Sequence, residues 1–224
     1  MAETKQTEGR PAASAAPAKR VLNAGSGGRA SRQLHPVFRR SGWAEVRLDI
    51  DPQAQPDHVG SFTDMNDNFH SASFDAVWSS HALEHLHAHE VPAALAEFRR
   101  ILKDDGFVLI RCPDIEIAAA LLAQHGPDHV AYTSSAGPIT PLDMLFGHGA
   151  SIARGRVHMA HRTGFTSASL AKLLLDAGFP TVVTKREYFD LWALALMPSS
   201  DLPRIQEELA AAGLDLSDAE DDVP

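Results

Sequence analysis

Glycines and one carboxylate in this sequence have the spacing of a nucleoside-binding site. The apolar residues 21–24 run directly into the sequence Gly-Ser-Gly-Gly, which predicts a strand followed by a glycine-rich turn. Such a turn lets the backbone approach a ligand closely and offers free N–H groups. Asp49 follows Gly25 by 24 residues, at the end of the next expected strand, where a carboxylate accepts hydrogen bonds from both ribose hydroxyls. Ala30 replaces the third glycine of the dinucleotide-binding fingerprint, so the pattern favours a ligand that has a ribose but no phosphates.

Histidines, acids and a cysteine raise the question of a metal site. Four histidines lie close together in the sequence: His81, His85, His87 and His89. Histidines four residues apart share a helix face, as in some zinc sites. The only nearby carboxylates are Glu84 and Glu90, and no second ligand cluster stands out, so we expect no metal. The single cysteine, Cys112, excludes an internal disulfide and is expected to be a small core residue.

Length and charge set limits on the class of protein. The 224 residues, 44% of them apolar, suffice for one ordinary globular domain. The net charge is −9, and the last ten residues hold five acids and no base. An acidic chain argues against nucleic acid as a partner, because such partners require a basic face. Apolar runs are far shorter than the ~20 residues of a membrane helix. The composition therefore predicts a soluble, cytoplasmic protein that does not bind membranes.

The elements that must position these residues alternate between strand and helix patterns. Strands are expected at residues 20–24, 45–50, 57–59, 74–79, 107–112, 181–186 and 191–197. Helices are expected at residues 91–103, 114–125, 167–177 and 202–212. Apolar strands between amphipathic helices indicate a mostly parallel sheet that is covered on both faces.

The remaining segments suggest a domain organisation. Residues 1–19 are rich in Ala and Pro and are predicted to be a disordered tail, as is the acidic segment 215–224. The folded domain is expected to span 20–200, with a C-terminal helix in 201–214. Within it, residues 126–164 break the strand–helix rhythm with scattered Gly, Pro and His, and we expect an irregular insertion on the substrate side.

Five motifs, in order, resemble those of class I S-adenosylmethionine-dependent methyltransferases over residues 20–197. They are NAGSGGR at 23–29, Asp49 as the ribose acid, FDAVWSSHALEH at 74–85, LKDDGFV at 102–108, and GFTSASLAKLLLDAGF at 164–179. Asn23 stands where most members have an acid. The opening L-N-x-G-x-G is most similar to a subset of small bacterial members of the family.

The resemblance implies a fold and a cofactor site. The fold is an α/β, Rossmann-like doubly wound sheet of seven strands in the order 3-2-1-4-5-7-6, with the last strand antiparallel. S-adenosyl-L-methionine would lie across the C-terminal ends of strands one, two and four. Its implied contacts are Asn23, Gly25, Ser26, Gly27, Asp49, Ile50, Ser61, Phe62 and Ser79. Ser61 stands where the family often has an acid for adenine, so the Ser61 hydroxyl, Asp64 or the backbone N–H of Phe62 could take that role.

The implied activity is methyl transfer to an O, N or S atom of a small molecule or glycan that the insertion selects. If the acceptor loses a proton, a base is needed where the strand ends meet the insertion. His161 is the first candidate, because it precedes the point where the loop rejoins the regular fold; His158 and His81 follow. Two alternatives remain, a nicotinamide-dependent oxidoreductase and a non-catalytic cofactor-binding protein with a protein partner. The sequence sets no oligomeric state.

Overall fold

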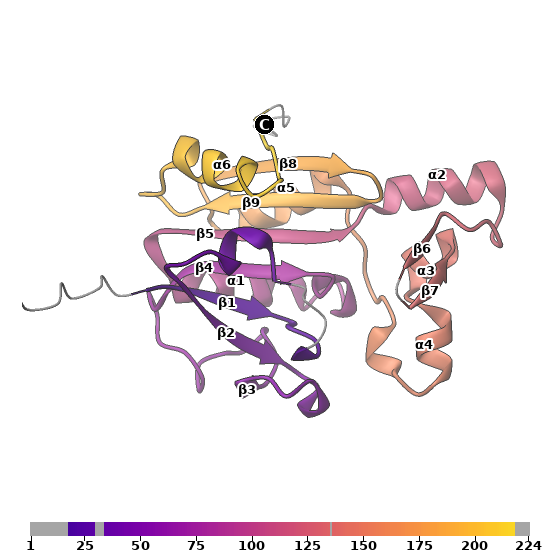
Figure 1. The fold of residues 1–224 in the computed structure, drawn as a ribbon, viewed down its shortest axis with the longest axis horizontal. Helices are drawn as coiled ribbons and strands as arrows, with labels where there is room; N and C mark the ends of the chain where they lie inside the picture. The colour runs from indigo at the N-terminus through magenta and orange to yellow at the C-terminus, as the bar shows by residue number, and fades with distance from the viewer. Residues whose placement is uncertain (1–17, 30–33, 135, 218–224) are drawn as a thin grey trace, which may run out of the picture.

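A seven-stranded sheet forms the centre of the molecule (Figure 1). The computed structural model describes residues 18–29, 34–134 and 136–217. The strands, in sheet order, are β3 (His58–Val59), β2 (Trp43–Asp49), β1 (Lys19–Ala24), β4 (Phe74–Ser80), β5 (Leu102–Pro113), β9 (Asp190–Leu196) and β8 (Thr181–Glu187). β9 runs antiparallel to both β5 and β8, and the other pairs are parallel. This confirms the expected order 3-2-1-4-5-7-6, because β6 and β7 form a separate hairpin and β8 and β9 are the sixth and seventh strands of the sheet.

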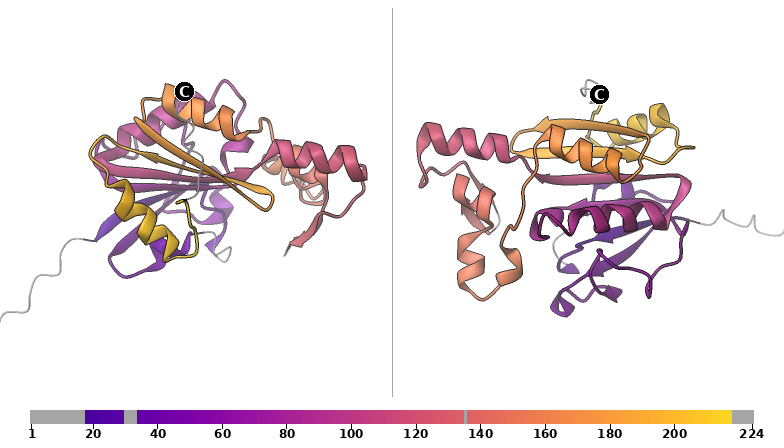
Figure 2. Two further views of the ribbon diagram at one scale, coloured as in Figure 1. Left: turned by 90° about the horizontal axis from the view of Figure 1, so that it is seen from above. Right: turned by 180° about the vertical axis from the view of Figure 1, so that it is seen from behind.

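Helices cover both faces of the sheet (Figure 2). The α-helices are α1 (Val91–Ile101), α2 (Ile115–His125), α3 (Pro141–Phe146), α4 (Gly149–Ala153), α5 (Ser167–Asp176) and α6 (Leu202–Ala210). The short 3₁₀ helices are η2 (Pro36–Arg39), η3 (Pro52–Ala54), η4 (Leu83–His85) and η5 (Val157–Met159). α1 and α5 pack on one face, whereas η2 and α6 pack on the other. None of the helices in the described part of the chain is long and apolar enough to span a bilayer.

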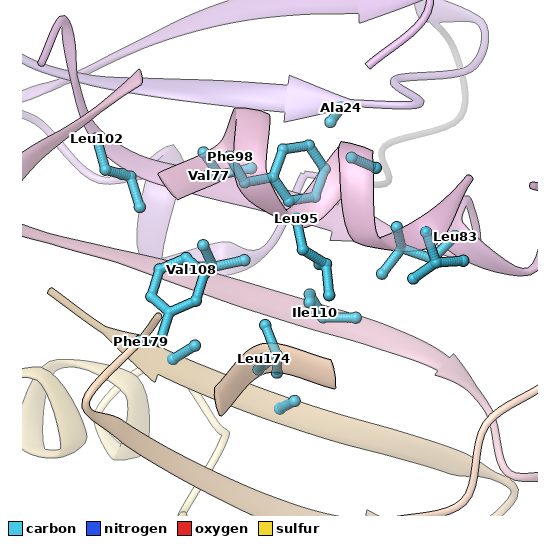
Figure 3. Close-up of a cluster of buried hydrophobic side chains, with 14 of the residues drawn as sticks. Ala24, Val77, Leu83, Leu95, Phe98, Leu102, Val108, Ile110, Leu174 and Phe179 are labelled. Carbon is cyan, nitrogen blue, oxygen red and sulfur yellow. The ribbon is translucent and has the colours of Figure 1, made fainter. Parts of the chain in front are cut away.

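The core lies in two layers on either side of the sheet. In the first layer, Leu95 and Phe98 of α1 and Leu174 of α5 meet Val77 and Val108 of the central strands (Figure 3). The second layer is aromatic and is built from Phe38, Trp78, Phe107 and Trp192 among others. Cys112 is fully buried in the first layer, as its apolar surroundings in the sequence predicted. The middle of each central strand is buried on both faces and is apolar there, as a central parallel strand requires: Val21 and Leu22 in β1, Val77 and Trp78 in β4, and residues 107–110 in β5.

The predicted insertion has more regular structure than its sequence indicated. It contains a hairpin of β6 (Tyr132–Ser134) and β7 (Gly137–Ile139), followed by α3, α4 and η5. Its small core of Ile139 and Met144 packs against Ala118 of α2. α2 and the insertion project beyond the C-terminal ends of the parallel strands (Figures 1 and 2), which is where an α/β sheet binds its ligands.

The ends of the domain differ slightly from the prediction. β1 begins at Lys19, so the strand includes the last residue of the expected tail 1–19, and α6 ends at Ala210. Residues 1–17 and 218–224, which make up most of the two predicted tails, lie outside the described residues.

Candidate functional site

The glycine-rich turn after β1 is fixed by its neighbours. The backbone N–H groups of Gly25 and Ser26 donate to the carbonyl oxygen of Leu48 at 2.9 and 3.1 Å, which ties the turn to β2. Gly25 and Gly27 have φ of +74° and +58°, the left-handed region that favours glycine. A Cβ on Gly25 would lie 2.5 Å from the Cβ of Ala82. The turn therefore packs directly on the segment that follows β4.

Asp49 is held at the end of β2 by backbone donors. Its Oδ2 accepts the N–H of Gly27 at 2.7 Å, and its Oδ1 accepts the N–H of Asp51 at 2.9 Å. A carboxylate has about four lone-pair directions, so each oxygen keeps capacity for a ligand hydroxyl. Ile50 follows directly and is 66% exposed, which places apolar surface beside the carboxylate. This combination suits a nucleoside, whose ribose is polar and whose base is flat and apolar.

Two buried hydroxyls near the same strand ends lack hydrogen-bond partners. Ser26 is 2% exposed and Ser79, on β4, is 1% exposed. Neither Oγ has a hydrogen-bond partner within the described part of the chain. A buried, unpaired hydroxyl costs roughly 1–3 kcal/mol, so such a pair points to polar groups of a ligand. Asn23 differs, because its Nδ2 already donates to Glu45 at 2.7 Å and links β1 to β2.

The segment after β3 carries the three candidates for adenine recognition. The hydroxyl of Ser61 lies 2.7 Å from that of Thr63 and accepts the Thr63 N–H, so its capacity is largely used locally. Asp64 bonds to the backbone and side chain of Asn66. The ring of Phe62 packs 5.7 Å from that of Phe98, but no described residue accepts a hydrogen bond from its backbone N–H. The Phe62 N–H and Oδ2 of Asp64 therefore keep capacity for a base, whereas the Ser61 hydroxyl is largely used.

A cavity of about 220 Å³ lies where β4 and the β8–β9 connection meet the insertion. It is lined by His81, Glu84, His85, Pro113, Tyr132, Ser134, Ile139, Asp143, Met144, His148, Met159, His161, Phe189 and Asp190. The rings of Tyr132 and Phe189 stack with centroids 5.2 Å apart and form an aromatic wall. The volume is below the ~300–1,000 Å³ of pockets for drug-sized ligands. The cavity therefore suits a small molecule or one terminal group of a larger one.

His81 is positioned by two carboxylates. Its φ of +50° is unusual for a residue with a side chain, and its N–H donates to the carbonyl of Arg111 at 2.8 Å. Its Nδ1 lies 3.4 Å from Glu84 and its Nε2 3.4 Å from Asp190. Burial alone would lower the pKa of His81, but the two carboxylates outweigh it and raise the pKa. His81 is therefore better suited to hold a proton than to take one.

His161 has the opposite character. Its backbone N–H donates to Phe146, and its Nδ1 lies 3.0 Å from the carbonyl oxygen of Met144. Burial lowers the pKa of His161 and outweighs the attraction of Glu84. The imidazole is therefore neutral near pH 7, and with Nδ1–H donated to a carbonyl, Nε2 carries the lone pair.

His158 lies apart from the cavity. It is half-exposed on η5, and its Nε2 is 3.9 Å from Asp51 Oδ2, beside the end of β2. Of the three histidines proposed from the sequence, His81 and His161 thus line the cavity, whereas His158 lies on the side of the expected cofactor site. Sequence reasoning missed Asp190, whose position at the start of β9 carries no motif. It considered Glu84 and His85 as metal ligands and set them aside in favour of a family pattern, without placing His161 beside them.

A family model described as a methyltransferase domain matches residues 5–184 of this chain. The match covers most of the sequence and includes β1, the glycine turn, Asp49 and the cavity segment 81–85. The chain belongs to the methyltransferase domain family. This finding favours the methyltransferase interpretation over the nicotinamide-dependent oxidoreductase.

Solved structures support the fold of this methyltransferase. A putative methyltransferase from Haloferax volcanii, in complex with the Trm112 activator, has 17% identity and a TM-score of 0.51 over 81% of this chain and 84% of that chain. The trans-methyltransferase CalH with S-adenosylhomocysteine has 17% identity and a TM-score of 0.52 over 81% and 52%. The CMeT domain of the citrinin polyketide synthase has 15% identity and a TM-score of 0.53 over 82% and 47%. This chain spans about half the length of the latter two. No curated protein matches the sequence significantly.

S-adenosylmethionine is the cofactor of this family, and the residues at the strand ends fit it. Asp49 has free acceptor capacity for ribose hydroxyls, and the hydroxyls of Ser26 and Ser79 are buried without partners in the described residues. The left-handed turn at Gly25 and Gly27 places backbone without side chains at the same edge of the sheet, where a cofactor can approach it closely.

Proposed function

We propose that this methyltransferase moves the methyl group of S-adenosylmethionine to an O, N or S atom of a small molecule, or of a terminal glycan group, bound in the histidine-lined cavity. One observation carries the proposal. Ala82 contacts the position of Gly25 in the cofactor turn, and its neighbours His81 and Glu84 line the cavity. Residues 81–84 therefore lie between the expected cofactor site and the cavity, so a single segment of the chain borders both the expected methyl donor and the expected acceptor.

On the cofactor side, Asp49 would hold the ribose, and the hydroxyls of Ser26 and Ser79 would bond to polar groups of the methionine portion. The Phe62 N–H and the exposed side chain of Ile50 would contact adenine. The cofactor, when bound, supplies a methyl group that a sulfonium has already activated. The main task of the protein is then to align donor and acceptor at near-contact distance.

On the acceptor side, His161 is the group best suited to take a proton. Its neutral ring is oriented by the carbonyl of Met144, and it lines the cavity. His81 lies between two carboxylates that favour its protonated form, so it would orient the acceptor or donate a hydrogen bond. His158 lies beside Asp51 and is not among the residues that line the cavity, so we assign it no part in proton transfer.

Transfer of a labelled methyl group tests this function. Purified protein would be incubated with methyl-labelled S-adenosylmethionine and with small-molecule and glycan fractions of a cell extract. We expect label in one fraction together with an equal amount of S-adenosylhomocysteine, and loss of both with Asp49→Ala. Binding of S-adenosylhomocysteine without label transfer to any fraction would instead favour the non-catalytic alternative. Binding of NADH but not of S-adenosylhomocysteine would favour the oxidoreductase.

A further inference from the structure

Three potential metal ligands from two distant parts of the chain meet in the wall of the cavity. Glu84 and His85 belong to η4, directly after β4, and His161 lies at the end of the insertion. One ligand atom from each residue lies within 4.8 Å of the other two. The insertion is fastened at this point, because the backbone N–H groups of Arg162 and Thr163 donate to the carbonyl of Glu84 at 2.8 and 3.3 Å.

Both histidines are oriented in the way that metal-bound histidines are. Nδ1 of His85 lies 3.2 Å from the carbonyl oxygen of Ala160, and Nδ1 of His161 lies 3.0 Å from that of Met144. A carbonyl accepts the N–H of the ring, which fixes the tautomer and leaves the lone pair on Nε2. Metal-binding histidines almost always donate their second N–H to such an oxygen, because this raises their basicity and holds the ring.

Glu84 supplies a buried carboxylate that has only one close protein partner among the described residues, His81. Its side chain is 1% exposed, and neither of its oxygens has a hydrogen bond of regular geometry within the described residues. Its nearest cationic neighbour is His81, at 3.4 Å. A buried carboxylate needs hydrogen bonds, a paired cation or a metal. The other two acids of the cavity already have donors: Asp190 accepts from Nε of Arg111 at 2.8 Å, and Asp143 accepts the N–H groups of Thr140 and Gly149 at 3.0 and 2.8 Å.

We propose that Glu84, His85 and His161 bind a divalent transition metal, with Zn²⁺ as the best match to the donor set. Two histidines and one glutamate, with a position left open, form a known arrangement for such ions. Zinc lies about 2.0–2.2 Å from such ligands, so the donor atoms end about 3.5 Å apart. The ligand atoms, which lie within 4.8 Å of one another, would therefore draw closer together when the ion binds.

The open position would face the cavity, so the ion would bind the donor atom of the acceptor. This role, unlike metal binding itself, rests on the proposed methyl transfer. The lone pair of His161 would then serve the ion and would not take the proton directly. Binding to a cation lowers the pKa of a hydroxyl or thiol, which favours acceptors that carry one. The proposal departs from the expectation of no metal, because the third ligand is far from the histidine run in the sequence.

Metal binding can be measured without any substrate. The full-length protein, stripped with a chelator, would be titrated with Zn²⁺ by calorimetry and with Co²⁺ by visible absorption, and S-adenosylhomocysteine binding would be measured on the same samples. We expect one ion per chain and tetrahedral Co²⁺ bands. Three variants each remove one proposed ligand: Glu84→Gln, His85→Ala and His161→Ala. Each should weaken Zn²⁺ binding by more than ~10–100-fold, which is the cost of losing a residue that only hydrogen-bonds to a ligand.

The exposed histidines of the same segment provide the control. His87 and His89 stack on each other outside the cavity, so the double variant His87→Ala/His89→Ala should bind Zn²⁺ as the wild type does. Loss of binding in that variant, or unchanged binding in the three ligand variants, would overturn the site. A protein that binds S-adenosylhomocysteine but no ion would also overturn it and leave the proposed function intact. Zinc binding without S-adenosylhomocysteine binding would support the site and contradict the function.

Discussion

At the scale of single residues, Gly25 has two separate reasons to be glycine. Its φ is +74°, and a Cβ would lie 2.5 Å from that of Ala82. Gly25→Ala should therefore lower the free energy of unfolding by about 2–4 kcal/mol, the sum of left-handed strain and overpacking. Adding Ala82→Gly should restore the part of the unfolding free energy that is lost to overpacking, because it removes the clashing Cβ. The part lost to the left-handed backbone conformation should remain lost. Urea unfolding of the two single variants and the double variant measures both parts. Simple additivity of the two single effects would contradict the packing explanation.

The residues of the site were only partly predictable from the sequence. Spacing located the glycine turn and Asp49, because a short turn and the end of a strand are local features. It did not distinguish the three histidines, since their character depends on groups far along the chain. Glu84 and then Asp190, which is far along the chain, raise the pKa of His81, whereas burial within the insertion lowers the pKa of His161. Asn23 matched a cofactor motif, and its motif did not indicate that Nδ2 donates to Glu45 on the neighbouring strand.

At the scale of elements, a capping box stabilises α3 and thereby His161. Thr140 Oγ1 accepts the Asp143 N–H at 3.2 Å, and Asp143 accepts the Thr140 N–H at 3.0 Å. Burial alone would raise the pKa of Asp143, but hydrogen bonds from Gly149 and Thr140 outweigh it and lower the pKa. α3 also contributes Met144, whose carbonyl orients His161. Thr140→Ala should lower the free energy of local unfolding of the insertion by about 1 kcal/mol.

We expect that cost to be local. Amide hydrogen exchange should accelerate in residues 141–161, and KM for the acceptor should rise, while S-adenosylhomocysteine affinity is unchanged. Thr166→Ala is the matched control, because Thr166 forms the same capping box with Ser169 at the start of α5, which covers the sheet. That variant should lower the global free energy of unfolding by a similar amount and leave KM for the acceptor unchanged. Identical behaviour of the two variants would contradict an independently stabilised insertion.

The elements of the sheet were predicted well and those of the insertion poorly. Apolar runs between amphipathic helices located every strand of the sheet to within a few residues, except that β5 begins at Leu102 and not at residue 107. Its early part, which is polar at Lys103 and Asp104, pairs only loosely with β4. Residues 126–164 have no continuous periodicity, because their short elements bury few side chains each. Only Pro141–Phe146 showed an apolar signal, and it is α3.

At the scale of the whole molecule, His35 couples stability to pH. It caps η2 and packs between Trp78 and Trp192, with ring centroids 5.5 and 5.6 Å away. Burial, helped by Arg39, lowers the pKa of His35 to about 4. The unfolded chain binds this proton near pH 6.5, before the folded protein does. The stabilisation is therefore complete above pH 6.5 and is lost as the pH falls towards 4, by about 3 kcal/mol.

His35→Asn keeps a capping acceptor but has no group that titrates in this range. The decrease in unfolding free energy between pH 7 and pH 4 should be about 3 kcal/mol smaller in the variant than in the wild type. Urea unfolding at several pH values measures it, with the exposed His70→Asn as a control that should follow the wild type. A parallel pH dependence in His35→Asn would show that other groups carry the acid sensitivity.

The arrangement of the whole molecule could be predicted only through the family resemblance. Periodicity indicates strands and helices but does not give the order of the strands in the sheet. The strand order 3-2-1-4-5-7-6 was predicted from the family motifs. The small bacterial subset suggested by L-N-x-G-x-G remains a prediction. No motif indicates that the cofactor turn, the segment 81–85 and the insertion lie side by side. Their arrangement depends on contacts between residues far apart in the sequence, such as His85 and Ala160.

Calorimetric titration with S-adenosylhomocysteine tests the central claim, that Asp49 and the glycine turn form the cofactor site. The wild type should bind one molecule per chain. Asp49→Ala should weaken binding at least about tenfold, or ~1.4 kcal/mol, because the ribose loses two charge-assisted hydrogen bonds. Asp51→Ala should change affinity much less, since that carboxylate accepts the Gln53 N–H as the cap of η3. Equal affinity in the wild type and Asp49→Ala, with both proteins folded, would contradict the account.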